Sequence, residues 1–137
     1  MATTDRNASS MTEDELRSAE TVRLIGSDKV EGTNVYNHAG DHLGSIDRVM
    51  IDKRSGKVSY AVMSFGGFLG IGEEHYPLPW DVLTYDVDRD GYVVDLSREK
   101  LEGAPSFGRG ADPDWQDPAY NRSIYGHYGL AYPYPVI

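Results

Sequence analysis

The chain of 137 residues contains no cysteine, which excludes disulfide bonds, thiolate metal sites, iron–sulfur clusters and cysteine nucleophiles. It also lacks a long hydrophobic run. The longest nearly uncharged stretch, residues 60–72, is interrupted by glycines and falls well short of the roughly 20 apolar residues that cross a bilayer. The polar beginning of the chain has no apolar centre of the kind found in signal peptides. We therefore expect a soluble, cytoplasmic protein without membrane insertion.

Positive charge is scarce: 13 basic side chains face 22 acidic ones, for a net charge of -9. A surface of this sign repels phosphate backbones and anionic headgroups, so we expect no nucleic-acid partner. A local basic patch is still compatible with this net charge. The length fits one domain with one hydrophobic core. No cofactor is expected either.

The composition divides the chain into three parts. Residues 1–20 are polar and poor in aromatic and β-branched side chains, which predicts a flexible N-terminal segment. Within it, Thr12 and Glu15 have the spacing of a capping box and indicate a short helix. Residues 21–101 form the predicted domain, and residues 102–137 form a tail rich in proline, tyrosine and glycine.

The predicted domain consists of short β-prone runs separated by glycine and aspartate turns, a pattern typical of a small barrel or sandwich. The predicted strands are Val22–Ile25, Asn34–Asn37, Leu43–Ile51, Lys57–Phe65, His75–Trp80, Val82–Tyr85 and Tyr92–Leu96. Two of them alternate clearly, which predicts that Tyr76, Leu78 and Trp80, and likewise Tyr92, Val94 and Leu96, point into the core.

Short connections join the predicted strands, and we expect Gly40, Gly56 and Gly91 to provide the positive φ that three of the turns need. Consecutive strands are therefore predicted to form antiparallel hairpins. Between them there is no room for the helical crossovers of a parallel sheet, which excludes Rossmann and TIM architectures. The predicted fold is mostly β, a small antiparallel β-barrel with a short C-terminal helix.

After the last predicted strand, residues 97–101 indicate one helical turn, and in the tail residues 105–116 indicate irregular chain. Asp117 followed by Pro118 is a helix-start signal and Gly129 a helix-stop signal, so a short helix is expected near 118–128. On it Tyr120, Ile124 and Tyr128 fall four residues apart and share one face. We expect that face to dock on the barrel or on a second subunit.

The clearest local motif is Asp86-x-Asp88-x-Asp90-Gly91, which has the carboxylate spacing of the first half of a calcium-binding loop. The twelfth position, where such loops carry a bidentate glutamate, is Ser97. The residues that follow alternate as in a strand and do not enter a helix. An acidic hairpin turn is therefore the favoured interpretation, and a metal site at Asp86, Asp88 and Asp90 is the alternative.

The glycine-rich segment of residues 66–72 exposes backbone amides but lacks the lysine-serine ending of a P-loop. We interpret it as a hairpin loop. Its side chains Phe68, Leu69 and Ile71 are candidates for a partner-binding tip, together with Tyr120, Ile124 and Tyr128 of the tail, and a core role is equally compatible with them.

The chain has four histidines, His38, His42, His75 and His127, which are candidate metal ligands. A predicted turn separates His38 from His42, so the helical geometry that would make them joint ligands is absent. A serine, histidine and acid arrangement is a further alternative, but the sequence has no Gly-x-Ser-x-Gly elbow. The ten tyrosines and two tryptophans are explained by packing of the core and the tail.

Several segments, taken in order, resemble the PRC-barrel family, named for the barrel of the photosynthetic reaction centre H subunit and shared with a ribosome maturation factor. The segments that carry the resemblance are Val30–Asn37, Gly40–Ile46, Ile51–Val58, Phe65–Gly72 and Leu78–Trp80. The tail, with Phe107, Trp115 and residues 124–128, is similar to that of small stand-alone bacterial members.

The resemblance implies a barrel fold without implying a reaction, because family members mostly serve as interaction or assembly modules. We therefore expect a non-catalytic interaction module that binds a protein partner or self-associates as a homodimer. A small-ligand or metal-sensing barrel, with calcium at the acidic hairpin, is the second hypothesis. An enzyme is the third, and no residue pattern favours it.

Overall fold

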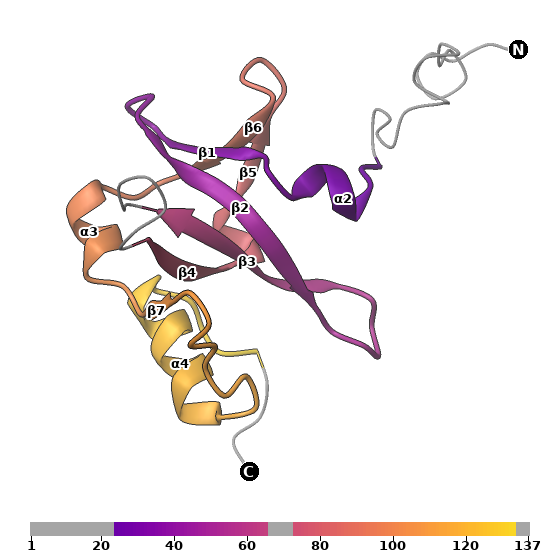
Figure 1. Ribbon diagram of the computed structural model, residues 1–137, viewed down its shortest axis with the longest axis vertical. Coiled ribbons are helices and arrows are strands. Elements are labelled where there is room, and N and C mark those ends of the chain that lie inside the picture. Colours follow the sequence, from indigo (N-terminus) through magenta and orange to yellow (C-terminus); the bar gives the residue numbers. More distant parts are fainter. Residues whose placement is uncertain (1–23, 66–72, 134–137) are drawn as a thin grey trace, which may run out of the picture.

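The computed structural model describes residues 24–65 and 73–133. Most of the described chain is strand and loop, with a longer helix near its C-terminal end (Figure 1). In chain order the elements are α2 (Ser27–Val30), β1 (Asn34–Asn37), β2 (His42–Ile51), β3 (Val58–Phe65), β4 (Glu74–Pro79), the 3-10 turn η2 (Trp80–Val82), β5 (Thr84–Asp86), β6 (Gly91–Val94), α3 (Arg98–Glu102), β7 (Phe107–Gly108) and α4 (Pro118–His127).

All seven strands belong to one sheet with the order β5-β6-β1-β2-β3-β4-β7. Figure 1 shows the β5–β6–β1 part of this sheet lying above the β3–β4 part. The consecutive pairs β1–β2, β2–β3, β3–β4 and β5–β6 are antiparallel, as predicted. Strands β1 and β6, which are far apart in sequence, pair in parallel, which the sequence did not indicate. Within the described residues β5 and β7 are the two edges, so the mostly-β, barrel-like fold is confirmed with an open sheet.

The turns follow the predicted chemistry at two of three places. Gly40 and Gly56 have positive φ, of 92° and 77°. In the third turn the prediction was wrong, because Asp90 takes the left-handed conformation, with φ of 52°, and Gly91 does not. Gly91 is needed for a different reason: a Cβ there would lie 2.7 Å from the carbonyl oxygen of Asn34 on the neighbouring parallel strand. The close approach of β1 and β6 therefore requires a glycine at this position.

The interior core lies on the concave face of the sheet and contains the residues predicted by alternation. Tyr76 and Leu78 of β4, together with Tyr92 and Val94 of β6, are at most 5% exposed. Trp80 and Leu96 are half-buried and pack against the same core. The other contributors are Val30, Val35, Leu43, Ile46, Ala61, Met63, Leu101 and Ala104.

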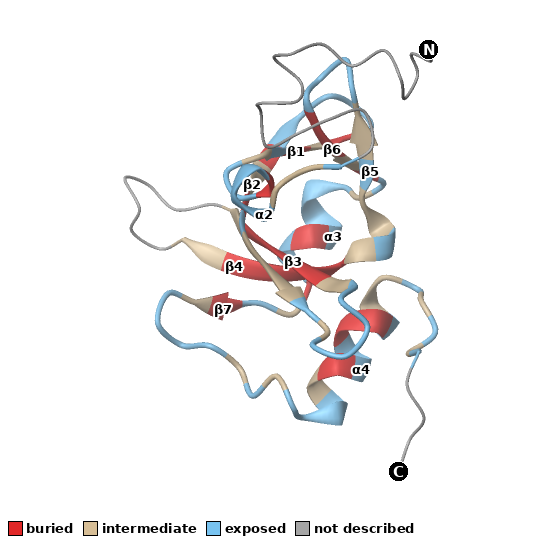
Figure 2. Ribbon diagram, turned by 90° about the vertical axis from the view of Figure 1, so that its right-hand side faces the viewer, coloured by how far each residue is buried: buried red, intermediate tan, exposed pale blue. Residues whose placement is uncertain are grey.

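The opposite face of β3 and β4 is also buried, because the tail covers it. Across the β3–β4 pair, Tyr60 opposes Pro79 and Val62 opposes Pro77, and all four are buried. Figure 2 shows buried positions on both β4 and the facing side of α4. A second apolar cluster, formed by Tyr60 with Ile124 and Tyr125 of α4, joins the tail to the sheet. The central strands are therefore enclosed between two apolar layers.

Several local elements differ from the sequence-based expectation. Of the strand predicted at residues 22–25, the described part contributes only a single bridge at Ile25, and the chain then turns into α2. The strand predicted at Val82–Tyr85 is replaced by η2 followed by β5. The stretch expected to be irregular contains the short strand β7, which pairs with β4 through Phe107.

Helices α3 and α4 both begin where the sequence predicts. Ser97 caps α3, its hydroxyl accepting a hydrogen bond from the amide of Lys100. Asp117 caps α4 in the same way, with Pro118 at the first turn, and Gly129 follows the helix with φ of 73°. Among the described residues, no helix has the length and apolar content needed to cross a membrane.

Candidate functional site

A groove with aromatic walls runs between the sheet and the tail. Its volume is about 250 Å³. The end of β2 and the start of β3 supply Met50, Ile51 and Tyr60. The tail supplies the opposite wall, with Trp115, Tyr125 and Tyr132 as its rings. The groove therefore exists only because the tail is docked on the sheet, and we call it the aromatic groove.

The aromatic rings are held in inclined positions. The ring centroids of Tyr60 and Trp115 lie 5.9 Å apart, and those of Tyr60 and Tyr125 lie 5.8 Å apart with an interplanar angle of 64°. Tyr125 and Tyr132 make a further edge contact at 5.4 Å. Such tilted contacts are the favoured geometry of aromatic pairs. They position the walls without the need for a ligand.

One buried hydrogen-bond network fixes the base of the groove. The Tyr60 hydroxyl donates to Oδ1 of Asn121 over 2.6 Å. The amide nitrogen of Asn121 in turn donates to the carbonyl oxygens of Trp115 and Asp117. Asn121 is only 7% exposed, so these bonds satisfy a polar group that would otherwise be costly to bury. The network joins β3 to the first turn of α4 and to the segment that precedes this helix.

The β2–β3 turn next to the groove carries charges of both signs, and its acidic and basic side chains differ in their hydrogen bonding. The carboxylate of Asp52 accepts hydrogen bonds from the backbone amides of Arg54 and Ser55 and so builds the β2–β3 turn. Lys53, Arg54 and Lys57 in the same turn are exposed. Within the described residues, the side chains of these three bases form no hydrogen bond or ion pair.

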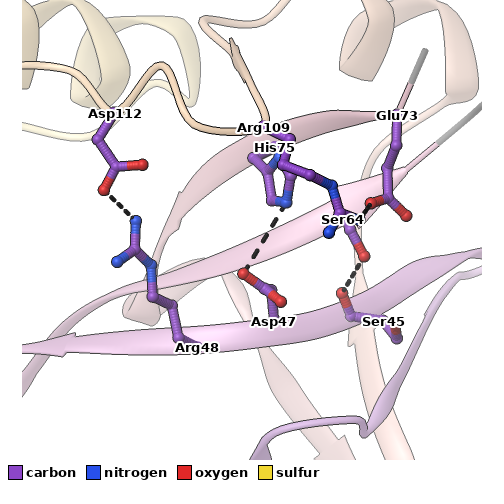
Figure 3. Close-up of polar contacts among 8 residues, drawn as sticks. All are labelled: Ser45, Asp47, Arg48, Ser64, Glu73, His75, Arg109 and Asp112. Carbon is purple, nitrogen blue, oxygen red and sulfur yellow. Dashed lines mark hydrogen bonds and ion pairs between the residues drawn. The ribbon is translucent and has the colours of Figure 1, made fainter. Parts of the chain in front are cut away.

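Polar contacts outside the groove fasten the tail to the sheet (Figure 3). Arg48 of β2 forms an ion pair and a hydrogen bond with Asp112 of the tail. Arg109 of the tail does the same with Glu73, at 2.8 Å. Between them the buried ring of His75 stacks on Phe107 of β7, with 5.4 Å between ring centroids. Exposed ion pairs are individually weak, so they orient the tail while the apolar contacts supply most of its stability.

Figure 3 also shows a serine, a histidine and an acid on neighbouring strands: Ser64, His75 and Asp47. Ser64 lies opposite His75 across the β3–β4 pair, but its hydroxyl donates to the carbonyl of Ser45 over 3.4 Å. The nearest His75–Asp47 approach is 3.9 Å, beyond hydrogen-bond range. A nucleophile needs its base within hydrogen-bond reach, so this arrangement lacks the geometry of a catalytic relay.

Four titratable groups near the tail have shifted pKa values. The hydrogen bond from the Arg48 guanidinium lowers the pKa of Asp112 below its usual range. Burial raises the pKa of Tyr120 and, more strongly, that of Tyr128, where the nearby phenols of Tyr76 and Tyr120 add to the effect. Burial also raises the pKa of Tyr76. These tyrosines are therefore neutral at physiological pH and act as packing groups.

The acidic motif forms a hairpin turn between β5 and β6. Asp86 accepts a hydrogen bond from the amide of Asp88, and its carboxylate lies 3.7 Å from the guanidinium of Arg89. Asp90 accepts a hydrogen bond from the Tyr85 hydroxyl. In the part of the chain that the structure describes, no group of three or more histidine and carboxylate side chains is arranged to hold a metal ion. The described contacts of these carboxylates are those of a turn.

A larger hollow of about 480 Å³ lies beside this turn. Its walls come mainly from α2 and the chain that follows, with Asp28, Lys29 and Glu31 among them, and Tyr85 is its one aromatic residue. The Tyr85 hydroxyl donates a hydrogen bond to Asp90, so this side chain stabilises the β5–β6 turn. The hollow is thus lined mostly by polar and charged residues, with Ile25 and Tyr85 as its large apolar side chains.

The histidines are dispersed over the fold. His42 bonds Asn34 through Nε2, and His127 contacts the carbonyl oxygen of Lys100 in the same way. His38 is exposed near the β5 edge, whereas His75 is buried under the tail. The proposed partner residues Phe68, Leu69 and Ile71 lie outside the described residues.

The predicted face of the tail helix docks on the sheet of the same chain. Ile124 is fully buried, and Tyr120 and Tyr128 are half-buried. Sequence reasoning did not identify the aromatic groove, because its walls come from strands and a tail separated by more than fifty residues. The available signal was the high density of tyrosine that follows Trp115.

No curated protein is similar enough to the chain to count as a relative. The sequence profile of the PRC-barrel domain matches residues 23–101, which include α2, α3 up to Leu101 and all the strands except β7. The tail, with β7 and α4, lies beyond the matched part. The match covers more than half of the chain, so this protein belongs to the PRC-barrel domain family.

Proposed function

We propose that this protein is a non-catalytic protein-interaction module of the cytoplasm, and that the aromatic groove is its partner-binding surface. The observation that supports the proposal is the groove itself, in which Tyr60, Trp115 and Tyr125 surround an open volume next to the half-exposed Ile51. Tyrosine and tryptophan are the residues that most often dominate binding energy at protein interfaces.

The size of the groove favours a protein partner over a cofactor. Sites for small molecules and cofactors typically measure about 300–1,000 Å³. The aromatic groove, at about 250 Å³, fits one or two anchoring side chains. Its walls are fixed by the Tyr60–Asn121 hydrogen bond and by ring contacts. Binding would therefore lose little conformational entropy in ordering these side chains.

A second copy of the chain is one candidate partner, since family members commonly act inside assemblies. A homodimer would place an apolar side chain of one copy in the groove of the other. The same surface would serve self-association or the binding of a different protein.

The experiment compares two exposed apolar residues. Ile51 is 50% exposed at the rim of the groove, and Val87 is 80% exposed on the β5–β6 turn. We expect Ile51→Asp to abolish capture of the partner from native cells, or the dimer measured by light scattering, while Val87→Asp leaves it unchanged. Equal loss in both variants, or in neither, would contradict the proposal. Circular dichroism confirms that both variants remain folded.

A further inference from the structure

The charges around the aromatic groove indicate the chemistry of its partner. In the whole chain acids outnumber bases by 22 to 13, yet three bases fall within five consecutive positions, Lys53, Arg54 and Lys57. They occupy the β2–β3 turn, which continues directly from the groove residue Asp52. Figure 1 shows this hairpin projecting beyond the body of the sheet. The turn therefore presents a basic rim on an acidic protein.

The helix contributes a fourth base. Arg122 is exposed and precedes Tyr125 by three positions, so it lies on the side of α4 that carries this groove residue. Within the described residues its side chain has no hydrogen bond or ion pair. Bases without partners among the described residues thus stand next in sequence to groove residues of both the sheet and the tail.

The acids of the same surface are engaged with the backbone. Asp52 accepts from two amides of its turn, Asp114 accepts from the amide of Gln116, and Asp117 caps α4 through the amide of Ala119. Each carboxylate therefore faces the positive ends of N–H dipoles, which offset part of its charge. The four bases Lys53, Arg54, Lys57 and Arg122 outnumber these three carboxylates, and within the described residues they lack such bonds.

The net charge of -9 does not reverse this preference for a bound segment. At physiological ionic strength the screening length is about 8 Å, so the charges beside the groove outweigh those on the far side of the protein. Attraction of this kind acts on specificity and on the association rate.

We infer that the aromatic groove binds an acidic segment of a partner protein that inserts one aromatic or large aliphatic side chain as its anchor. This inference rests on the proposed function of the groove and specifies its ligand. The anchor packs against Tyr60, Trp115 and Tyr125, while flanking carboxylates approach the basic rim.

The test uses the full chain and two synthetic peptides, one with a tryptophan flanked by glutamates and one with the same tryptophan flanked by lysines. Binding is followed by the NMR shift of the Trp115 indole N–H. We expect the acidic peptide to shift this signal and to bind more weakly as salt rises. Equal binding of both peptides, or shifts that map away from the groove, would overturn the inference.

A charge-matched pair of variants provides the control. Lys53→Glu with Lys57→Glu alters the rim, whereas Lys29→Glu with Lys100→Glu makes the same change in net charge on α2 and α3. We expect the rim variant to bind the acidic peptide roughly fivefold more weakly than the control. Equal affinity would refute the role of the rim.

The two proposals fail separately. If the acidic peptide does not bind but Ile51→Asp still loses its partner, the preference for acid is wrong and the groove keeps its function. If the acidic peptide does not bind and Ile51→Asp also behaves like Val87→Asp, both proposals are wrong.

Discussion

Replacing Ile124 by alanine should destabilise the protein strongly, because this residue joins the tail to the sheet. Ile124 is fully buried in the cluster with Tyr60 and Tyr125. The substitution removes three buried carbons, worth about 0.8 kcal/mol each, and leaves a cavity that adds to the cost. We expect a loss of roughly 3 kcal/mol. The matched substitution Ile51→Ala, at a residue 50% exposed, should cost less than about 1 kcal/mol.

Urea unfolding measures both losses. For a small domain the free energy falls by about 1–3 kcal/mol per molar urea, so the midpoint of Ile124→Ala should fall by roughly 1–3 M. Trp115 reports on the tail and Trp80 on the interior core. Recording the transitions in a Trp80→Phe background, by Trp115 fluorescence and by circular dichroism, shows whether the tail and the sheet unfold together.

The reasoning would be refuted if Ile124→Ala and Ile51→Ala shifted the midpoint equally. That result would mean that the helix face carries no buried contact in solution. A fall in Trp115 signal ahead of the circular dichroism signal would instead show a tail that detaches before the sheet unfolds, with the free energy of docking given by the first transition.

Four further substitutions test other parts of the account. Tyr60→Phe leaves the buried Oδ1 of Asn121 without its donor and should cost about 1–3 kcal/mol in urea unfolding, with no change in circular dichroism. Gly44→Ala places a Cβ against the carbonyl oxygen of Ser64 on β3 and should disrupt the β2–β3 pair. Gly126→Ala, at an exposed helix position where the new Cβ meets nothing within 4 Å, should instead raise the melting temperature through a gain of about 0.5–1 kcal/mol. The pKa of Asp112 is lower in the folded protein than in the unfolded chain, where it is near 3.8. The stability that this ionised carboxylate contributes is therefore fully present at a pH above 3.8 and is lost as the pH falls through the folded-state pKa. The urea midpoint of Asp112→Asn should accordingly fall less steeply below about pH 4 than that of the unmodified protein; parallel curves would contradict this.

The sequence predicted those features that depend on neighbouring residues. Alternation placed Tyr76 and Leu78 in the core, and the Asp117–Pro118 pair marked the start of α4. These signals are local, because strand periodicity and helix capping involve residues a few positions apart.

Features that depend on long-range contacts were not predictable in this way. Pro77 and Pro79 alternate with the core residues and should face solvent, yet both are fully buried because the tail covers them. Gly91 was assigned to the turn, whereas its role is to allow the close approach of β1. The aromatic groove likewise requires Tyr60 and Trp115 to meet across the sheet–tail junction. Only the folded chain brings these residues together.

The central claim is that the tail docks on the sheet of its own chain and thereby forms the aromatic groove. The most direct test is an NMR experiment on an equal mixture of isotope-labelled and unlabelled protein, in which contacts within one chain and between chains are separated. The account predicts nuclear Overhauser effects between the methyl groups of Ile124 and the ring of Tyr60 within one chain. Effects found only between labelled and unlabelled chains, or no effect at all, would contradict it.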